Sequence, residues 1–138
     1  MDVVKEYFKG DTFAKNRGIE IVDVSPGHAR VKMPITPDHL NAMGIVHGAA
    51  VFAVADFAFA VASNSHKTLA VAISANICFV KAATEGTLFA EAREESRNPK
   101  IASYSIRVSD EADETVAIFQ GLVYRKKDSL TDFVKDAR

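Results

Sequence analysis

The sequence predicts an α+β protein in which a curled antiparallel sheet wraps around one long buried helix. The first observation behind this prediction is an apolar stretch from Gly48 to about Ser63, rich in alanine and without internal proline or glycine. It is too long for an average strand, so a helix is predicted. Strand-like segments surround it and follow one another through tight turns without helical crossovers, as in antiparallel sheets. Curling that sheet around the helix is the simplest way to bury an element that is apolar on nearly every face.

The residues before this helix predict a short helix, a hairpin and a loop. Apolar residues recur at helical spacing in residues 3–8, and Gly10 can end that helix. The segments "GIEIVDV" and "HARVKMPI" flank the turn signal "SPG", and apolar residues of the second alternate with Arg30 and Lys32 as in a half-buried strand. The following "TPDHLNAMGIVHG" is rich in turn formers and predicts an irregular loop.

Four further strands are predicted after the helix. They are "TLAVAISANICFV", "GTLFAEAREES", "IASYSIRVSD" and "TVAIFQGLVYRKK", and the turn signals "RNPK" and "EADE" separate the last three. The first of them has its larger apolar residues at odd positions, from Leu69 to Phe79. The tail "DSLTDFVKDAR" is compatible with a short helix or with a frayed end. Because no linker, repeat or low-complexity run interrupts the pattern, residues 1–138 are predicted to form a single domain.

Composition argues against several classes of partner. The net charge is −1, with 17 basic and 18 acidic residues, which gives no reason to expect nucleic acid or an anionic membrane as a partner. The longest apolar run is interrupted by Asp56 and is shorter than the ~20 residues that span a bilayer. No secretory signal is seen in "MDVVKEYFKG", and the single Cys78 excludes an internal disulfide framework and a cysteine metal cluster. We therefore expect a cytoplasmic protein without metal or cofactor.

Asp56 is the one ionisable residue between Gly48 and Ala62. An ionised carboxylate in apolar surroundings costs several kcal/mol unless it is paired. Positions 52, 53, 59 and 60, one helical turn away, carry no charge. Asp56 must therefore find a partner outside its own helix, or face a cleft or an interface, where it becomes a candidate catalytic group. A satisfied structural aspartate and a solvent-facing one are the alternatives.

The start of the predicted helix is a candidate anion site. The segment "MGIVHG" has no Ser, Thr, Asp or Asn directly before the helix to cap its first amides, and Gly48 lets a ligand come close. Such amides can hold the oxyanion that develops in acyl transfer. The side-chain amide of Asn41 is in reach to help, although Asn is also a common turn former. His47 is interpreted as a loop-ordering or site-lining residue rather than a base.

The spacing of Gly48 and Asp56 limits how they can act together. Eight residues of helix place them ~12 Å apart along its axis, so one substrate carbonyl cannot touch both. If both serve one reaction, they must come from different copies of the chain. The spacing thus predicts a site shared across a dimer.

The stretch "HLNAMGIVHGAAVFAVAD" closely resembles the central motif of the hotdog-fold acyl-CoA thioesterases of the PaaI-like (phenylacetic-acid-degradation) family. The pattern is an Asn, a Gly, a His-Gly-Gly at the helix start and an Asp inside the helix. It is carried here by Asn41, Gly44, His47, Gly48 and Asp56. The element order supports the resemblance over about residues 18–126. The resemblance implies a hotdog fold, hydrolysis of acyl-CoA to a free acid and CoA, and homodimers that commonly pair into homotetramers.

The resemblance also implies a role for each matching residue. Asp56 activates a water as general base or attacks the thioester as nucleophile, and the Gly48 amide polarises the thioester carbonyl. Asn41 and His47 hold this region, with Asn41 also in position to contact the substrate or the nucleophilic water. Ser74, in "AISAN", matches a strand position where the family often has Ser or Thr, although a strand Ser is usually a surface or packing residue.

Two further features complete the predicted site. Ala49 stands where the family usually has a second Gly, which leaves the Gly48 amide intact and narrows the space beside it. The phosphates of CoA need cationic or amide partners, for which Lys81, Arg97 and Lys100 are candidates. Solvated turn charges are the alternative reading of these three residues.

Two other functions stay open at this stage. A hotdog hydratase or dehydratase is one, although "DHLNAMGIVH" lacks the Asp-x-Asn-Pro pattern of one such group. A non-catalytic acyl-CoA sensor is the other, and the presence of Asp56 favours chemistry over it. The acyl group is not set by the sequence, because Phe52, Phe57 and Phe59 can line an aryl or medium-chain pocket or simply belong to the core.

Overall fold

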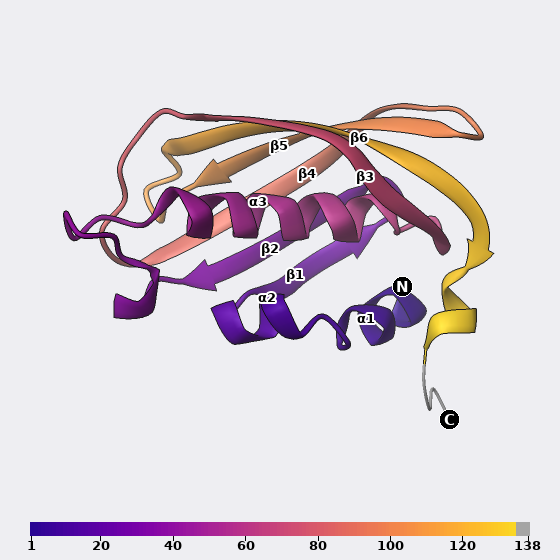
Figure 1. Ribbon diagram of the computed structural model, residues 1–138, viewed down its shortest axis with the longest axis horizontal. Coiled ribbons are helices and arrows are strands. Elements are labelled where there is room, and N and C mark those ends of the chain that lie inside the picture. Colours follow the sequence, from indigo (N-terminus) through magenta and orange to yellow (C-terminus); the bar gives the residue numbers. More distant parts are fainter. Residues whose placement is uncertain (135–138) are drawn as a thin grey trace.

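A computed structural model describes residues 1–134 and shows one six-stranded antiparallel sheet curled around a single long helix, α3 (Figure 1). The strand order is β1-β2-β4-β5-β6-β3. The strands are β1 (Glu20–Ser25), β2 (His28–Pro34), β3 (Thr68–Phe79), β4 (Thr87–Arg97), β5 (Ile101–Ser109) and β6 (Thr115–Ser129). The predicted curled α+β arrangement and the hairpin of the first two strands are confirmed.

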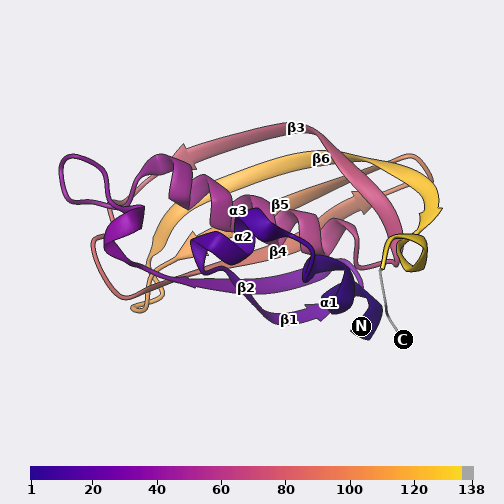
Figure 2. The same ribbon diagram turned by 60° about the horizontal axis from the view of Figure 1, so that its bottom comes forward.

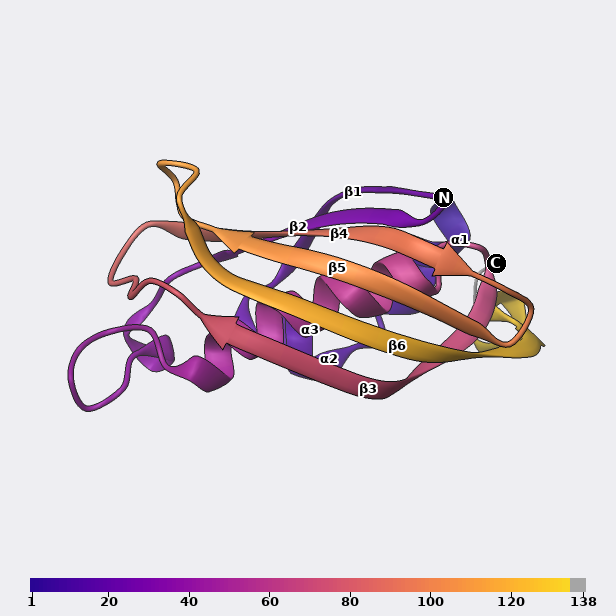
Figure 3. The same ribbon diagram turned by 90° about the horizontal axis from the view of Figure 1, so that it is seen from above.

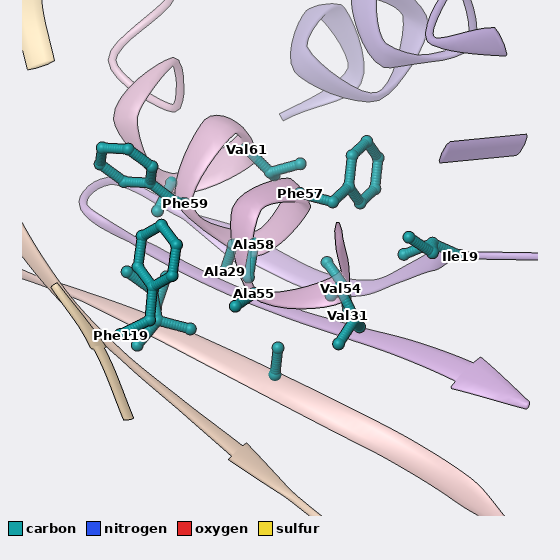
Figure 4. Packing of buried hydrophobic residues seen from close by; sticks show 14 of the residues in the cluster. Ile19, Ala29, Val31, Val54, Ala55, Phe57, Ala58, Phe59, Val61 and Phe119 are labelled. Atoms are coloured by element: carbon teal, nitrogen blue, oxygen red, sulfur yellow. The ribbon is translucent and has the colours of Figure 1, made fainter. Parts of the chain in front are cut away.

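Helix α3 (Gly48–Ser63) lies in the concave face of the sheet, as the apolar stretch predicted. Its Phe59 ring lies 5.5 Å from the ring of Phe119 on β6, and the two approach each other in Figure 4. A Cβ added at Gly121 would come 2.5 Å from the Phe59 ring, so only glycine lets β6 approach the helix this closely. Phe57 points to the other side of the helix and packs on Phe8 at 5.5 Å.

Two helices precede the sheet and lie across the side of α3 that the strands leave open (Figure 2). The predicted short helix is α1 (Asp2–Phe8). The second, α2 (Thr12–Arg17), was not predicted because its six residues bury only Ala14 and show no apolar periodicity. Its signals were the capping residues: Asp11 accepts a hydrogen bond from the Ala14 amide, and Gly18 ends the helix with a φ of 77°.

Two short 3₁₀ turns complete the described chain. The first, η1 (Pro37–His39), lies in the loop that was predicted to be irregular. The second, η2 (Leu130–Phe133), follows β6 and shows that part of the charged tail is ordered as a turn of helix. Residues 135–138 of that tail lie outside the described residues. None of the helices in residues 1–134 has the length and apolar character needed to cross a membrane.

Strand β3 forms one edge of the sheet, and Figure 3 shows it outermost, beyond β6. Its twelve residues pair only with β6 in residues 1–134. Three of the large apolar residues at its odd positions are exposed: Val71 is 41% exposed, Ile73 55% and Phe79 56%, whereas Leu69 and Ile77 are partly buried against the core. A long apolar edge with unpaired backbone groups is a template for pairing with another chain.

Candidate active site

A hollow of ≈ 370 Å³ lies at the start of α3, where the sequence predicted an anion site. It lies between the loop before the helix and the end of β3. Its lining residues are Asn41, Ile45, Val46, Gly48, Val51, Phe79, Val80, Lys81, Ala82 and Ala83. The fold therefore brings Asn41, Gly48 and Lys81 together, as the sequence predicted for the first two.

Asn41 organises the loop with its carbonyl oxygen and leaves its amide group available. Its Oδ1 accepts hydrogen bonds from the backbone amides of Met43 at 2.9 Å and Ile45 at 3.3 Å. These bonds fix the orientation of the side chain, because only the oxygen can accept. The Nδ2 group has no acceptor in residues 1–134 and belongs to a residue that lines the hollow. Gly44 supplies the left-handed turn of this loop with a φ of 79°.

His47 is the N-cap of α3. Its Nδ1 accepts from the Ala49 amide at 2.9 Å, and its carbonyl accepts from the amides of Ala50 and Val51. The usual caps are Ser, Thr, Asp and Asn, so residue type alone did not indicate a histidine in this position. Its own amide donates to the carbonyl of His39 at 2.7 Å, which ties the helix start to η1.

The Gly48 amide is the donor of the first helical turn that these caps leave unused. The next three amides are bonded to His47, whereas that of Gly48 has no acceptor within residues 1–134. A Cβ at Gly48 would lie 3.3 Å from the Phe79 ring. The absence of a side chain at Gly48 therefore leaves space beside its amide in this corner of the hollow. One free, fixed amide at a helix start is a suitable oxyanion donor.

Asp56 lies in the middle of the least buried stripe of α3. Phe52 and Ala60, four residues to either side, are likewise not fully buried, and most of the other faces of the helix are covered. No hydrogen bond or ion pair to the Asp56 carboxylate occurs within residues 1–134. Burial raises the pKa of Asp56, and the negative charge of Asp11 at the start of α2 raises it further. The carboxylate is thus partly desolvated and without a cationic partner in the described chain.

Ser74 lies apart from the other predicted catalytic residues within one chain. It pairs with Leu122 on β6 and lines a separate hollow of ≈ 350 Å³ with Asn76, Ser103 and Gln120. Gly121, the neighbour of Leu122, faces Phe59 in the core, so Leu122 and its partner Ser74 face the convex side of the sheet. The structure therefore does not bring Ser74 to the helix start or to Asp56.

The three predicted CoA-binding cations lie in two different places. Lys81 lines the hollow at the helix start, but its ammonium forms ion pairs with Asp110 at 2.6 Å and with Glu114. Arg97 and Lys100 lie in and beside the β4–β5 turn, at the opposite end of the sheet. The sequence spacing gave no sign of this separation, because strand order decides it.

The histidines and acids form no metal site in the part of the chain described, where no group of three or more such ligands converges. His39 is buried and held by the Thr36 amide at 3.0 Å and the Arg17 carbonyl at 2.8 Å. A ring that accepts at Nδ1 and donates at Nε2 is neutral, so His39 joins η1 to the end of α2 as a structural residue.

Comparison with known proteins places this arrangement in a family. A family model described as thioesterase superfamily matches residues 43–117. A relative from Archaeoglobus fulgidus is 42% identical over 124 residues, covering 88% of this chain and 80% of the relative. The acyl-coenzyme A thioesterase PaaI of Escherichia coli is 34% identical over 125 residues, covering 90% of this chain and 89% of the relative.

A solved structure supports the same grouping. The E. coli PaaI protein from the phenylacetic acid degradation operon superposes with a TM-score of 0.86 at 34% identity, covering 88% of this chain and 89% of that chain. The likeness includes the sheet and the central helix that together carry the candidate site.

Proposed function

The chain belongs to the thioesterase superfamily, and from this premise we propose that it hydrolyses acyl-CoA thioesters to a free acid and CoA at a site shared by two copies of the chain. The resemblance to the PaaI-like hotdog thioesterases, first seen in the residues of the central motif, is confirmed. The acyl-CoA substrate of the E. coli relative and the acetyl CoA bound in a Streptococcus mutans structure of the same fold support the choice of substrate.

The observation that carries the shared site is the separation of two unsatisfied groups. The Gly48 amide and the Asp56 carboxylate each have no partner in residues 1–134, and eight residues of α3 hold them ~12 Å apart. When water attacks a thioester carbonyl, the base must lie within hydrogen-bond reach of the water and the oxyanion donor within reach of the carbonyl oxygen. Two copies with antiparallel α3 helices can supply both, one group from each.

The edge strand β3 supports such a dimer. Pairing two β3 edges about a two-fold axis satisfies the unpaired backbone groups of each strand. The two-fold axis makes the α3 helices antiparallel and turns their less buried stripes toward the interface. Asp56 of one subunit then lies beside Gly48 of the partner subunit, and the same contact recurs at the second site.

In the proposed reaction Asp56 accepts a proton from water while the water oxygen attacks the thioester carbon. The Gly48 amide donates a hydrogen bond to the carbonyl oxygen as it becomes negative, and the free Nδ2 group of Asn41 donates to the substrate. The carbon–sulfur bond then breaks, and the CoA thiolate takes the proton from the Asp56 carboxyl group. His47 and the Gly44 turn hold the amide in place.

A nucleophilic route uses the same residues. The Asp56 carboxylate attacks the thioester carbon, CoA leaves, and water hydrolyses the resulting mixed anhydride. A single turnover in heavy-oxygen water, followed by mass spectrometry of the peptide that contains Asp56, tests for this route. Label in that peptide identifies a nucleophilic route in which water attacks the aspartyl carbon of the anhydride, and label confined to the product acid excludes that course.

Release of free thiol tests the function itself. A panel of aryl, short-chain and medium-chain CoA thioesters should yield stoichiometric CoA with at least one class of acyl group. Tight acyl-CoA binding without thiol release would identify a sensor, and conversion of an enoyl-CoA without thiol release would identify a hydratase. Phe52, exposed one helical turn from Asp56, is the aromatic residue that we expect to influence acyl preference, because Phe57 and Phe59 are buried in the core.

We also propose that two dimers pair through the convex face of the sheet. Ile118, Leu122 and Tyr124 on β6 are exposed there, at 49%, 38% and 41%. Apolar residues gathered on the outer face of this strand are a reasonable second interface. Sedimentation of Leu122→Glu should show dimers in place of tetramers.

A further inference from the structure

A basic hollow of ≈ 650 Å³ lies where the β4–β5 turn meets the end of β6. Its lining residues are Thr68, Arg97, Asn98, Pro99, Arg125, Lys126 and Lys127. Four of these seven are cations and none is acidic. We propose that this hollow binds the phosphates of the CoA nucleotide, an inference that rests on the proposed thioesterase function.

Arg97 is held in place by a chain of polar groups that leads into the core. The hydroxyl of the buried Tyr104 donates to Glu94 Oε1 at 2.8 Å, and His66 Nε2 lies 2.8 Å from the same oxygen. Arg97 in turn lies over the His66 ring, with Nη1 2.6 Å from Nδ1 and 2.9 Å from Nε2. Arg97 Nε also lies 3.9 Å from Glu94 Oε2, so the same carboxylate attracts the guanidinium directly.

The charge of Glu94 is maintained within this chain. Burial raises the pKa of Glu94, but the hydrogen bonds from His66 and Tyr104 outweigh burial and leave that pKa lowered. The ionised carboxylate fixes His66 and, through it, the position of Arg97. A guanidinium whose position is set before binding loses less entropy when it captures a phosphate.

Arg125 and the turn it meets are also preformed. Arg125 Nη1 donates to the Asn98 carbonyl at 2.9 Å, and the Arg125 amide donates to the Lys100 carbonyl at 2.7 Å. Asn98 Oδ1 accepts from the amides of Lys100 and Ile101 at 2.9 and 2.8 Å, which closes the turn. Hydrogen bonds therefore hold the wall formed by Asn98 and Arg125 in place, and Lys126 and Lys127 also line the hollow.

Lys126 and Lys127 keep their charges available to a ligand. Both are exposed, and the ion pairs found within residues 1–134 do not include either of them. Lys81 differs, because Asp110 and Glu114 already neutralise it. The proposed nucleotide site thus leaves out Lys81, keeps Arg97, and adds three cations from β6 that the sequence spacing did not connect.

The position of the hollow suits a substrate that is long and charged at one end. It lies beyond the end of α3, because Thr68 follows that helix by five residues. In the proposed dimer the thioester sits at Asp56, ~10 Å of helix before Ser63. The pantetheine arm of CoA can cover the remaining distance, with the thioester at the shared site and the nucleotide at the surface. Three phosphates match paired arginines and lysines better than a single anion does.

Charge reversal tests the inference through KM. We expect Lys126→Glu/Lys127→Glu to raise KM for the best acyl-CoA on the order of tenfold, because charge-assisted contacts to phosphate are lost. Turnover at saturation should change less than about twofold. The same acyl group carried on pantetheine, which has no nucleotide, should show no change in KM. Lys9→Glu/Lys15→Glu, with an equal change in net charge on the N-terminal segment, should leave both KM values unchanged.

The results separate this inference from the function on which it rests. If the parent protein releases thiol from acyl-CoA and the Lys126/Lys127 variant keeps its KM, the basic hollow is not the nucleotide site. A KM increase that is equal for the pantetheine substrate also overturns it. If the parent protein releases no thiol from any acyl-CoA, the proposed function itself is wrong. Arg125→Gln offers a second variant that removes one charge without reversing it, and the same KM pattern is expected.

Discussion

At the scale of single residues, the proposed chemistry rests on one carboxylate in an unusual place. Asp56 is partly buried in an apolar helix and has no partner in residues 1–134. Such an ionised carboxylate destabilises its own subunit unless a group outside that subunit pairs with it. The proposed pairing with the Gly48 amide across an interface would satisfy both groups.

Replacing Asp56 by Asn should remove activity and preserve the fold. The substitution keeps the shape of the side chain and removes the base or nucleophile, so kcat should fall on the order of 100-fold or more. Circular dichroism and sedimentation of the same variant provide the control for folding and assembly. Near-normal turnover in a well-folded Asp56→Asn protein would exclude Asp56 from the reaction.

The pH dependence of the reaction should show the raised pKa of Asp56. Burial is the larger cause of the raised pKa, and the negative charge of Asp11 is the smaller one. We therefore expect kcat/KM to fall on the acid side with a midpoint above 3.8, the ordinary pKa of an aspartate. Activity is lost as pH falls, since the base must be ionised. Asp11→Asn keeps a side chain that can cap α2 and removes one negative charge, so it should move the midpoint to lower pH. A midpoint at or below 3.8 would contradict the assigned base.

The same shift has a consequence for folding. A carboxyl group whose pKa is higher in the folded than in the unfolded state favours folding most at low pH. Its contribution is lost as pH rises from the unfolded value through the folded one. Asp56→Asn should therefore be at least as stable as the parent protein at neutral pH. Thermal unfolding of both proteins between pH 4 and 7, above the ordinary carboxyl pKa of 3.8, measures this difference.

At the scale of elements, the start of α3 depends on an unusual cap. The Nδ1 atom of His47 takes the Ala49 amide, and the loop that leads to it is tied by Asn41 and Gly44. The cap leaves the Gly48 amide as the unused donor. A histidine with this role stabilises the helix and positions the proposed oxyanion donor at the same time.

Removing the cap should therefore affect stability and rate together. We expect His47→Ala to lower the free energy of unfolding by about 1 kcal/mol, the usual cost of a lost N-cap. Its kcat should fall because the first turn is less well fixed. His47→Asn, which can accept the same amide, should recover most of both quantities. A variant that recovers stability but not kcat would show that the imidazole itself takes part in the reaction.

The β3 edge is the second element whose role is testable. A charge at an exposed apolar position of this strand opposes edge-to-edge pairing, as natural edge strands show. We expect Ile73→Lys to shift the protein to monomers in sedimentation and to abolish thiol release, with the circular dichroism spectrum retained. Phe13→Lys, at an equally exposed position on α2, is the matched control and should leave both assembly and activity intact. Active monomers of Ile73→Lys would rule out the shared site.

At the scale of the whole molecule, two inactive variants should restore each other. In the proposed dimer each site takes Asn41 and Gly48 from one chain and Asp56 from the other. A mixed dimer of Asp56→Asn and Asn41→Ala therefore has one site with both substitutions and one with neither. Random pairing makes about half of the dimers mixed, so co-expression should recover roughly a quarter of the parent activity.

The controls for this experiment are the two single variants and a measure of mixing. Each variant alone must be nearly inactive, and differently tagged chains must co-purify to show that mixed dimers form. Mixed dimers that stay inactive would mean that Asp56 and Asn41 serve within one chain.

Local patterns in the sequence were sufficient for most of the fold. Helix propensity and the absence of internal breakers located α3, and period-two alternation located the strands, because both signals depend on neighbours along the chain. Helix α2 was not predicted, because six residues with one buried side chain show no apolar periodicity. The motif residues Asn41, Gly48 and Asp56 were likewise visible in the sequence, as was the distance that one helix imposes between two of them.

The sequence by itself therefore determined most of the elements and the motif, and it predicted a site shared by two copies of the chain. The tertiary structure alone decided which side chains meet. Strand β3 follows α3 in sequence but pairs with β6, and this turns Ser74 to the convex face and leaves the apolar edge open. The pairing of Lys81 with Asp110, and the meeting of Arg97 with Arg125, also join residues far apart along the chain. Such contacts depend on strand order, which many distant pairings set together and no local pattern records.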